Sequence, residues 1–267
     1  MLRVDKLDIT IGGKPILEDV SLAVEQGQTL CIAGESGSGK SSLLKAINGL
    51  MPARFDRISF RGTGDPDVLH EGKWRGKPGL TGSRWVMQDP IAALNPKRTL
   101  GASVGESLHL KKPSAADLSK AVSAALADVE LPAVMAMRKP SEVSLGQAQR
   151  ACLARALIAR PALIFFDEPL SALDAIVQKQ IAATMKRIQE RYRITFVIVT
   201  HDLGFAAAFA DQMLVLRNGK VEACQPAKLF FDRPASRYCM DLIEAARDLG
   251  SLPQASVKAH SHAEASP

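Results

Sequence analysis

Glycine, lysine and serine stand at fixed spacing near the start of the chain, in a pattern that can hold phosphate groups. Gly34, Gly39, Lys40 and Ser41 fit the pattern G-x-x-x-x-G-K-[ST]. The backbone N–H groups of such a loop point inward around phosphate oxygens, while Lys40 adds a positive charge and Ser41 offers a hydroxyl to Mg²⁺. The pattern therefore predicts a site for a nucleoside triphosphate. The residues expected to contact the nucleotide are Gly34, Ser36, Gly37, Ser38, Gly39, Lys40, Ser41 and Ser42.

Two acidic residues and a histidine follow short apolar runs farther along the chain. Asp167 and Glu168 come directly after the run 162–166, and His201 follows the run 194–200. Such runs predict buried parallel strands, whose carboxyl ends meet at the ligand-binding edge of an α/β sheet. Beside the loop, Asp167 can hold Mg²⁺ and Glu168 can act as a general base toward water. An acidic pair alone is as readily a solvated turn, so the loop upstream is what favours a site.

The remaining pattern predicts strands that alternate with helices. Short alternating runs indicate an antiparallel sheet over residues 2–33, and Asn218 and Gly219 predict the turn of a hairpin. The glycine-rich and charged segment 61–83 is expected to be an exposed insertion with little regular structure. Further elements are expected as helix 42–51, strand 84–86, helices over 105–136, a helix opening at 143–150 and helix 176–192.

Composition limits the classes of protein to which the chain can belong. Its 267 residues, 46% hydrophobic and 23% charged, suit one large domain or a domain with a subdomain. No apolar run approaches the roughly 18 to 20 residues of a membrane-spanning helix, and the start lacks the apolar core of a secretory signal, so we expect a cytoplasmic protein. The net charge is +6, but basic residues are scattered and aromatics are few, so no nucleic-acid partner is expected. Four cysteines without a C-x-x-C pair favour reduced thiols.

Six motifs in a fixed order resemble those of the ATPase subunit of an ABC transporter. Apart from the phosphate loop each motif is weak alone, but six in order are very specific, and together they cover nearly all of the chain. The matching segments are the phosphate loop Gly34 to Ser41, the glutamine loop at Gln88, the signature Val143 to Gln147, the acidic strand Leu163 to Glu168, the aspartate loop Ser171 to Asp174 and the switch histidine His201.

The resemblance implies a fold and its boundaries. The fold would be α/β, a phosphate-loop nucleotide hydrolase core with a mixed sheet, an N-terminal antiparallel β subdomain and a helical subdomain. Residues 1–250 would form this ATPase domain, with the helical subdomain at about 90–160. Residues 251–267 would be a disordered tail.

The resemblance also implies roles for single residues. ATP and Mg²⁺ would be bound, with Ser41, Gln88 and Asp167 near the metal. Glu168, His201 and Gln88 would form the catalytic group, in which His201 holds the γ-phosphate and Gln88 senses Mg²⁺ and water.

Partners follow from the same resemblance. Two ATPase domains would close head to tail, with Asp174 linking the two sites, and the second ATPase could be identical or different. The residues expected to grip the γ-phosphate of the partner's ATP are Ser144, Gly146 and Gln147. Closure would drive transmembrane subunits seated near residues 88–110, and indirectly serve an extracytoplasmic solute-binding protein. The chain would then lie on the cytoplasmic face of the inner (plasma) membrane as a peripheral subunit.

Two residues depart from the family pattern. The signature reads VSLGQ where the family usually has LSGGQ, so Leu145 replaces a glycine and would weaken the partner's site. Ile11 stands where the family tends to place an aromatic residue that stacks on adenine, so base selectivity is expected to be loose.

The segments QDPIAALNP and LFFDRPASRYCMDLIEA resemble ATPases that serve importers of peptides, nickel and opine metallophores. The favoured function is therefore to power uptake of such a small solute. One alternative is an ATPase of the same superfamily that works with a soluble enzyme complex, for example in phosphonate breakdown, and the sequence does not separate it from the importer. A second is a nucleotide-binding regulatory module, against which the intact hydrolytic residues argue, namely Lys40, Asp167, Glu168 and His201.

Overall fold

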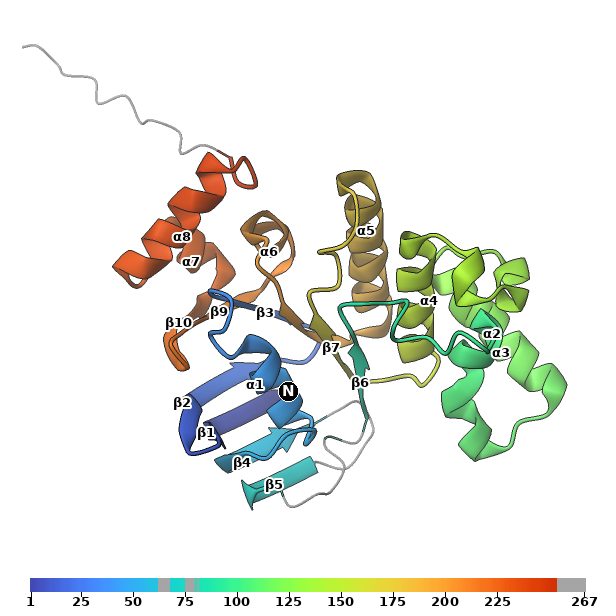
Figure 1. Ribbon diagram of the computed structural model, residues 1–267, viewed down its shortest axis with the longest axis horizontal. Helices are drawn as coiled ribbons and strands as arrows, with labels where there is room; N and C mark the ends of the chain where they lie inside the picture. Colours follow the sequence, from blue (N-terminus) through green and yellow to red (C-terminus); the bar gives the residue numbers. More distant parts are fainter. Residues whose placement is uncertain (62–67, 75–79, 81, 254–267) are drawn as a thin grey trace, which may run out of the picture.

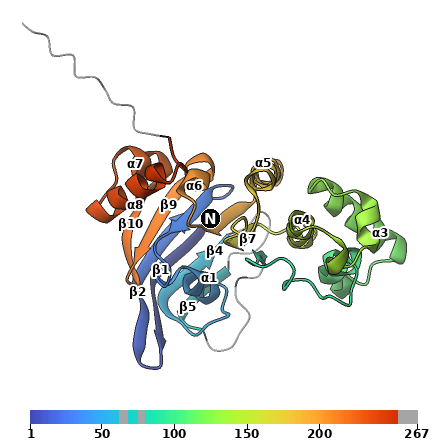
Figure 2. The ribbon, with the colours of Figure 1, turned by 45° about the horizontal axis from the view of Figure 1, so that its top comes forward.

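The computed structural model describes residues 1–61, 68–74, 80 and 82–253, and within these ranges the strands form two sheets (Figures 1 and 2). Apolar side chains cover both faces of the larger sheet. Along its strand at 29–33, Leu30 and Ile32 belong to one buried cluster, while Cys31 and Ala33 belong to another. Successive side chains of a strand point to opposite faces, so a wholly apolar strand becomes the centre of two cores.

The antiparallel sheet has the order β2-β1-β4-β5. Its strands are β1 (Leu2–Ile11), β2 (Lys14–Val24), β4 (Arg54–Phe60) and β5 (Val68–Lys73). Pairing of β1 with β2 confirms the sheet predicted near the N-terminus. The prediction of little regular structure over 61–83 is wrong where β5 pairs with β4, and Trp74 is buried beside it. Residues 62–67, 75–79 and 81 of that segment lie outside the described residues.

The larger sheet has the order β10-β9-β3-β8-β7-β6. Its strands are β3 (Thr29–Ala33), β6 (Ser83–Val86), β7 (Leu163–Asp167), β8 (Thr195–Val199), β9 (Gln212–Arg217) and β10 (Lys220–Pro226). All neighbouring pairs are parallel except the hairpin of β9 and β10, which turns at Asn218 and Gly219 as predicted. The mixed sheet confirms the predicted fold class. Its parallel register brings the carboxyl ends of β3, β7 and β8 to one edge.

Helices lie on the sheet and in a group beyond its β6 end. Near the sheet are α1 (Lys40–Ile47), α5 (Ala175–Tyr192), α6 (Leu203–Phe209), α7 (Ala227–Asp232) and α8 (Arg237–Asp248). The group beyond β6 comprises α2 (Leu100–Val104), η1 (Gly105–Lys111), α3 (Ala115–Asp128), η2 (Ala133–Met137), η3 (Pro140–Glu142) and α4 (Leu145–Leu157) (Figure 1). We call this group the helical subdomain.

The structure refines one predicted end point, and another lies mostly outside the described residues. Helix α1 ends at Ile47 rather than at 51, because the N–H groups of Asn48 and Gly49 already close the last turn. Of the predicted tail 251–267, residues 254–267 lie outside the described part of the chain. Among the described helices, none is both long and apolar enough to cross a bilayer.

Candidate nucleotide-binding site

The phosphate loop joins β3 to α1 and folds around the Lys40 side chain. Lys40 Nζ donates to the carbonyl oxygens of Gly34 (2.8 Å) and Glu35 (2.7 Å), and the residue is only 8% exposed. Burial lowers the pKa of Lys40 from its usual 10.5, an effect that the charges of Glu168 and Asp167 oppose. The loop therefore holds a poorly hydrated cation that an anion would stabilise.

The shape of the loop fits a phosphate group. Gly34 has φ of 140°, and a Cβ there would collide with the carbonyl oxygen of Leu216 on β9. The Ser38 hydroxyl is buried and, among the described residues, has no hydrogen-bond partner. A buried unpaired hydroxyl is costly unless a ligand satisfies it. Ser36 and Gly37 are exposed at the tip of the loop, as access for a ligand requires.

Asp167 lies at the end of β7 and faces the start of α1. Its Oδ1 accepts a hydrogen bond of 2.9 Å from Ser41 Oγ. Burial raises the pKa of Asp167 above its usual 3.8, the neighbouring Glu168 charge raises it further, and the Ser41 bond opposes both. These two predicted metal ligands are thus adjacent, and they offer the oxygen donors that Mg²⁺ prefers. Ser42, in the same turn of α1, is half-buried.

Glu168 is the meeting point of the three predicted catalytic residues. Gln88 Nε2 donates to Glu168 Oε2 at 3.3 Å, and His201 Nδ1 lies 3.3 Å from the same oxygen. These side chains come from the loop after β6, the end of β7 and the end of β8. A small hollow lined by Glu168, Thr200 and His201 adjoins them. A carboxylate placed so can accept a proton from water while the Gln88 amide donates to it and the His201 ring lies beside it.

Hydrogen bonds of three further polar residues stabilise this edge of the sheet. These residues were not predicted as site residues. Ser171 Oγ donates to the Glu168 carbonyl at 3.1 Å, and Gln178 Nε2 donates to the Leu170 carbonyl at 2.9 Å. Thr200 Oγ1 accepts from Asp202 N at 3.1 Å, which fixes the turn carrying His201. Ser171 belongs to the aspartate-loop motif, so the sequence could have indicated it. No motif in the sequence includes Gln178.

The signature residues lie elsewhere in the chain. Ser144 caps α4, where its hydroxyl accepts from Gln147 N at 3.3 Å and its N–H donates to Gln147 Oε1 at 3.0 Å. Gly146 is in the first turn, and both views show α4 beyond β7 from α1 (Figures 1 and 2). Asp174 caps α5 by accepting from the N–H groups of residues 176 and 177. Within one chain, therefore, these residues form a second surface, apart from the phosphate loop.

The structure shows the positions of the two residues that depart from the family pattern. Leu145 is the first residue of α4 and is not left-handed, so the helix accepts it without strain. Ile11 ends β1 with half of its surface exposed and offers an apolar face.

Comparison with known proteins decides the family. A family profile described as ABC transporter matches residues 17–171. This chain belongs to the ABC transporter family. The nickel import ATP-binding protein NikE of Rhodospirillum rubrum is 34% identical to this ABC family member over 237 residues, which are 88% of the chain and 84% of that protein. The oligopeptide transport ATP-binding protein OppF of Haemophilus influenzae is 36% identical over 205 residues, 76% of the chain and 61% of that protein.

Solved structures share the fold of this ABC family member. The ATP-binding cassette MJ0796, solved as a dimer in a post-hydrolysis state with ADP and Pi, is 26% identical with a TM-score of 0.69, covering 85% of this chain and 99% of that one. Some curated relatives are longer, since the chain spans 43% of the length of two of them and 65% of a third.

Proposed function

We propose that this chain is the ATP-hydrolysing subunit of an ABC importer. The observation that carries the proposal is the convergence of Lys40, Asp167, Glu168, Gln88 and His201 at one edge of the sheet. A module that only binds nucleotide needs the loop but not a carboxylate flanked by an amide donor and an imidazole ring. The convergence therefore favours hydrolysis over regulation.

Each side chain has a chemical task in this proposal. Lys40 and the loop N–H groups bind phosphate oxygens, and Glu168 accepts a proton from the attacking water. Gln88 and His201 orient that water and the γ-phosphate. Mg²⁺, when bound, supplies positive charge that offsets the charge on the phosphate oxygens, and Ser41, Asp167 and Gln88 are the residues that would hold it.

The complete site needs a second ATPase, identical to this chain or different. Ser144, Gly146 and Gln147 would approach the γ-phosphate bound by the partner, where the N-terminus of α4 favours an anion. Asp174 would link the two sites. The dimer of the similar cassette supports this arrangement. Leu145 would make the site on the partner's loop the weaker one.

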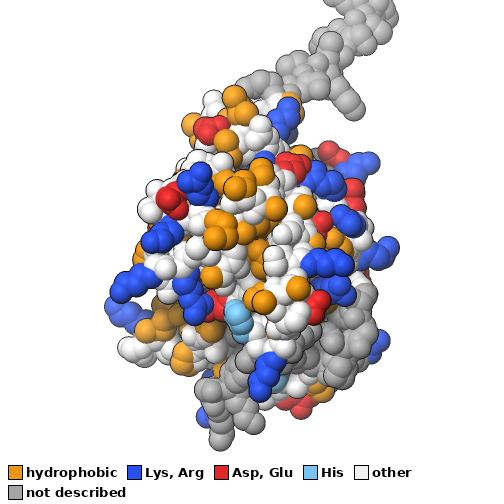
Figure 3. All heavy atoms as spheres, turned by 90° about the vertical axis from the view of Figure 1, so that its right-hand side faces the viewer, with side chains coloured by type: hydrophobic (Ala, Val, Ile, Leu, Met, Phe, Trp, Pro, Cys, Tyr) orange, Lys and Arg blue, Asp and Glu red, His pale blue; other side chains and the backbone are white. Residues whose placement is uncertain are grey.

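Membrane partners are proposed for the side of the molecule that carries the helical subdomain. Figure 3 shows apolar side chains at the centre of this face and basic side chains around them. Met87, Ile91, Val134 and Met137, on or beside the helical subdomain, are 40 to 76% exposed. Transmembrane subunits would dock here, near residues 88–110, with the chain on the cytoplasmic face of the inner membrane. Residues 1–250 would act as one ATPase domain.

The cargo proposed is a small solute such as a peptide, nickel or a metallophore, delivered by an extracytoplasmic solute-binding protein. Support comes from the relatives, which are named as nickel import and oligopeptide transport proteins.

ATP turnover tests the hydrolytic part of the proposal. We expect the assembled ATPase pair with Mg²⁺ to release phosphate from ATP, and Lys40→Ala in this chain to lose at least about tenfold in ATP affinity because a charged hydrogen bond is removed. Lys120→Ala, which removes an exposed lysine on α3, is the control and should behave as the native chain. Equal ATP affinity in Lys40→Ala and Lys120→Ala would contradict the assignment of the loop.

A further inference from the structure

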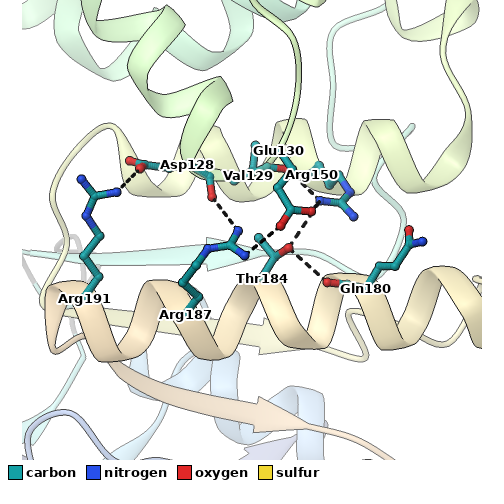
Figure 4. A network of polar contacts seen from close by, with 8 residues as sticks. All are labelled: Asp128, Val129, Glu130, Arg150, Gln180, Thr184, Arg187 and Arg191. Atoms are coloured by element: carbon teal, nitrogen blue, oxygen red, sulfur yellow. Dashed lines mark hydrogen bonds and ion pairs between the residues drawn. The ribbon is translucent and has the colours of Figure 1, made fainter.

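Five charged residues form a cluster where the end of α3 meets α4 and α5 (Figure 4). We call it the seam cluster, and its members are Asp128, Glu130, Arg150, Arg187 and Arg191. Glu130 bridges two arginines, with Oε2 2.7 Å from Arg150 Nη1 and Oε1 2.8 Å from Arg187 Nη1. Asp128 accepts from Arg191 Nη1 at 2.9 Å. The cluster thus joins the helical subdomain to the long helix of the core.

Arg150 is the buried centre of the seam cluster. It is 8% exposed, and its Nη1 also donates to the Val129 carbonyl (2.9 Å) and to Thr184 Oγ1 on α5 (3.4 Å). A buried guanidinium is stable only when its donors are paired, so Arg150 needs these partners in place. Arg150 lies in the second turn of α4, the helix that Ser144 caps. Its contacts therefore connect α4, the helix that carries the signature, to the end of α3 and to α5.

Glu130 is held in a backbone conformation that few non-glycine residues adopt. Its φ is +59°, a left-handed conformation that L-residues avoid for steric reasons. Its N–H donates to the Ala127 carbonyl at 3.0 Å, and its carboxylate is held by the two arginines. Such strain persists only where the surroundings enforce it.

The packing around the seam cluster is open. A cavity of about 410 Å³ lies between α3, the end of α4 and the end of α5, lined by Ala124, Leu157 and Tyr192 among others. A second hollow of about 200 Å³ is lined by members of the seam cluster itself. Both hollows open to solvent, so interdigitated apolar side chains do not fill the space at this point and the ion pairs of the seam cluster make more of the contact.

We propose that Glu130 and Arg187 are positioning residues that fix the orientation of the helical subdomain against α5. They act through Arg150, which carries the orientation to α4 and so to Ser144 and Gln147 at its start. Only the catalytic consequence rests on the proposed function, because it assumes that the signature acts on a partner's ATP. The orientation itself is a property of this chain.

A distance measurement tests the orientation directly. The exposed native Cys224 on β10 and a Lys120→Cys substitution on α3 provide two spin-label positions, since the other three cysteines are buried. By double electron–electron resonance the otherwise native chain should give one narrow distance distribution. Glu130→Gln and Arg187→Gln should each broaden it, and the double variant should be no broader than Glu130→Gln, because Glu130→Gln already removes the only ion pair that Arg187→Gln removes from the seam cluster.

Control variants distinguish the loss of the Glu130–Arg187 ion pair from a general effect of removing a charge. Arg237→Gln removes an ion pair of equal length, 2.8 Å to Asp241, that lies within α8 and should leave the distribution unchanged. Glu130→Gly suits the left-handed backbone and should broaden the distribution without loss of folding. Unchanged distributions in both Glu130→Gln and Arg187→Gln would overturn the proposal.

Turnover distinguishes this proposal from the proposed function. In the assembled ATPase pair we expect kcat to fall about tenfold in Glu130→Gln while KM for ATP stays within about twofold, because the signature is displaced but the phosphate loop is untouched. Broadened distances in the two variants, together with a native ATPase pair that hydrolyses no ATP, would refute the proposed function alone. Broadened distances with unchanged kcat in an active pair would refute the positioning role.

Discussion

Glu168 is fixed by its backbone as well as by its side chain. Its φ is +46°, its N–H donates to the Val199 carbonyl at 3.0 Å, and its carbonyl accepts from Ser171. The left-handed conformation costs a non-glycine residue about 1 kcal/mol, which these hydrogen bonds offset. Strain of this kind is a mark of functional positions.

Replacing Glu168 by glutamine should lower kcat for ATP hydrolysis at least about 100-fold and change Kd for ATP less than about threefold. The amide keeps the size of the side chain but cannot take a proton from water. Phosphate release gives kcat, and titration with a fluorescent nucleotide gives Kd. Glu190→Gln, an exposed change on α5, is the control. Normal turnover in Glu168→Gln would exclude Glu168 as the base.

Part of the site was predictable from residue types and spacing. The loop, the acidic pair and His201 meet because each follows an apolar strand, and parallel strands present their ends at one edge. The contact of Lys40 with two loop carbonyls and the left-handed Glu130 carry no sequence signal. Both depend on tertiary neighbours, which a local pattern does not contain.

Helices α4 and α5 approach each other closely at Gly146. A Cβ built on Gly146 would lie 2.7 Å from Val177 Cγ1, and valine has little rotamer freedom with which to move away. Glycine in the signature therefore allows the two helices to pack, in addition to any role at a phosphate.

Gly146→Ala should lower Tm by about 3 to 10 °C, since overpacking costs about 1 to 3 kcal/mol. Adding Val177→Ala should recover most of the loss, because it removes the methyl group in the way. Thermal unfolding of both single variants and the double variant provides the cycle. If Gly146→Ala has the Tm of the native chain, or if adding Val177→Ala does not raise the Tm of Gly146→Ala, the close approach of the two helices does not affect stability.

The seam cluster predicts a pH dependence of stability. Hydrogen bonding to Arg150, and to a smaller extent to Arg187, holds the pKa of Glu130 below its usual 4.5, against the opposing effect of burial. A depressed folded-state pKa stabilises the protein above pH 4.5 and ceases to do so as pH falls through the folded value.

The difference in Tm between the native chain and Glu130→Gln should therefore be present at pH 7 and shrink below pH 4.5. Because Glu130 is half-exposed, we expect less than about 1 kcal/mol. Thermal unfolding from pH 3 to 7 measures the difference. A difference that does not change with pH would show that the carboxylate charge does not stabilise the seam.

Elements differ in how well the sequence predicts them. Buried strands such as β7 and β8 are uniformly apolar and stand out. Strand β5 is an edge strand whose composition is rich in charge and glycine, and only its pairing with β4 makes it a strand. Strand β5 thus depends on a long-range contact, which residue composition does not predict.

The two halves of the proposed site, the phosphate loop and the signature, lie on separate surfaces of one chain. Glu168→Gln should therefore form a stable ATPase pair with ATP but not with ADP, since bound ATP is kept and joins the loop of one chain to the signature of the other. Light scattering of this variant, with any second ATPase that co-purifies, reports the mass. A mass that ATP does not change would argue against a shared site.

Isolation of the tagged chain from its native cell membranes in mild detergent tests the importer proposal most directly. Mass spectrometry of the complex should find two multispanning chains and a second ATPase subunit, and a co-purifying solute-binding protein would indicate the cargo. Recovery with soluble enzymes alone, and without any membrane-spanning chain, would contradict the importer proposal and leave only the ATP chemistry of the site.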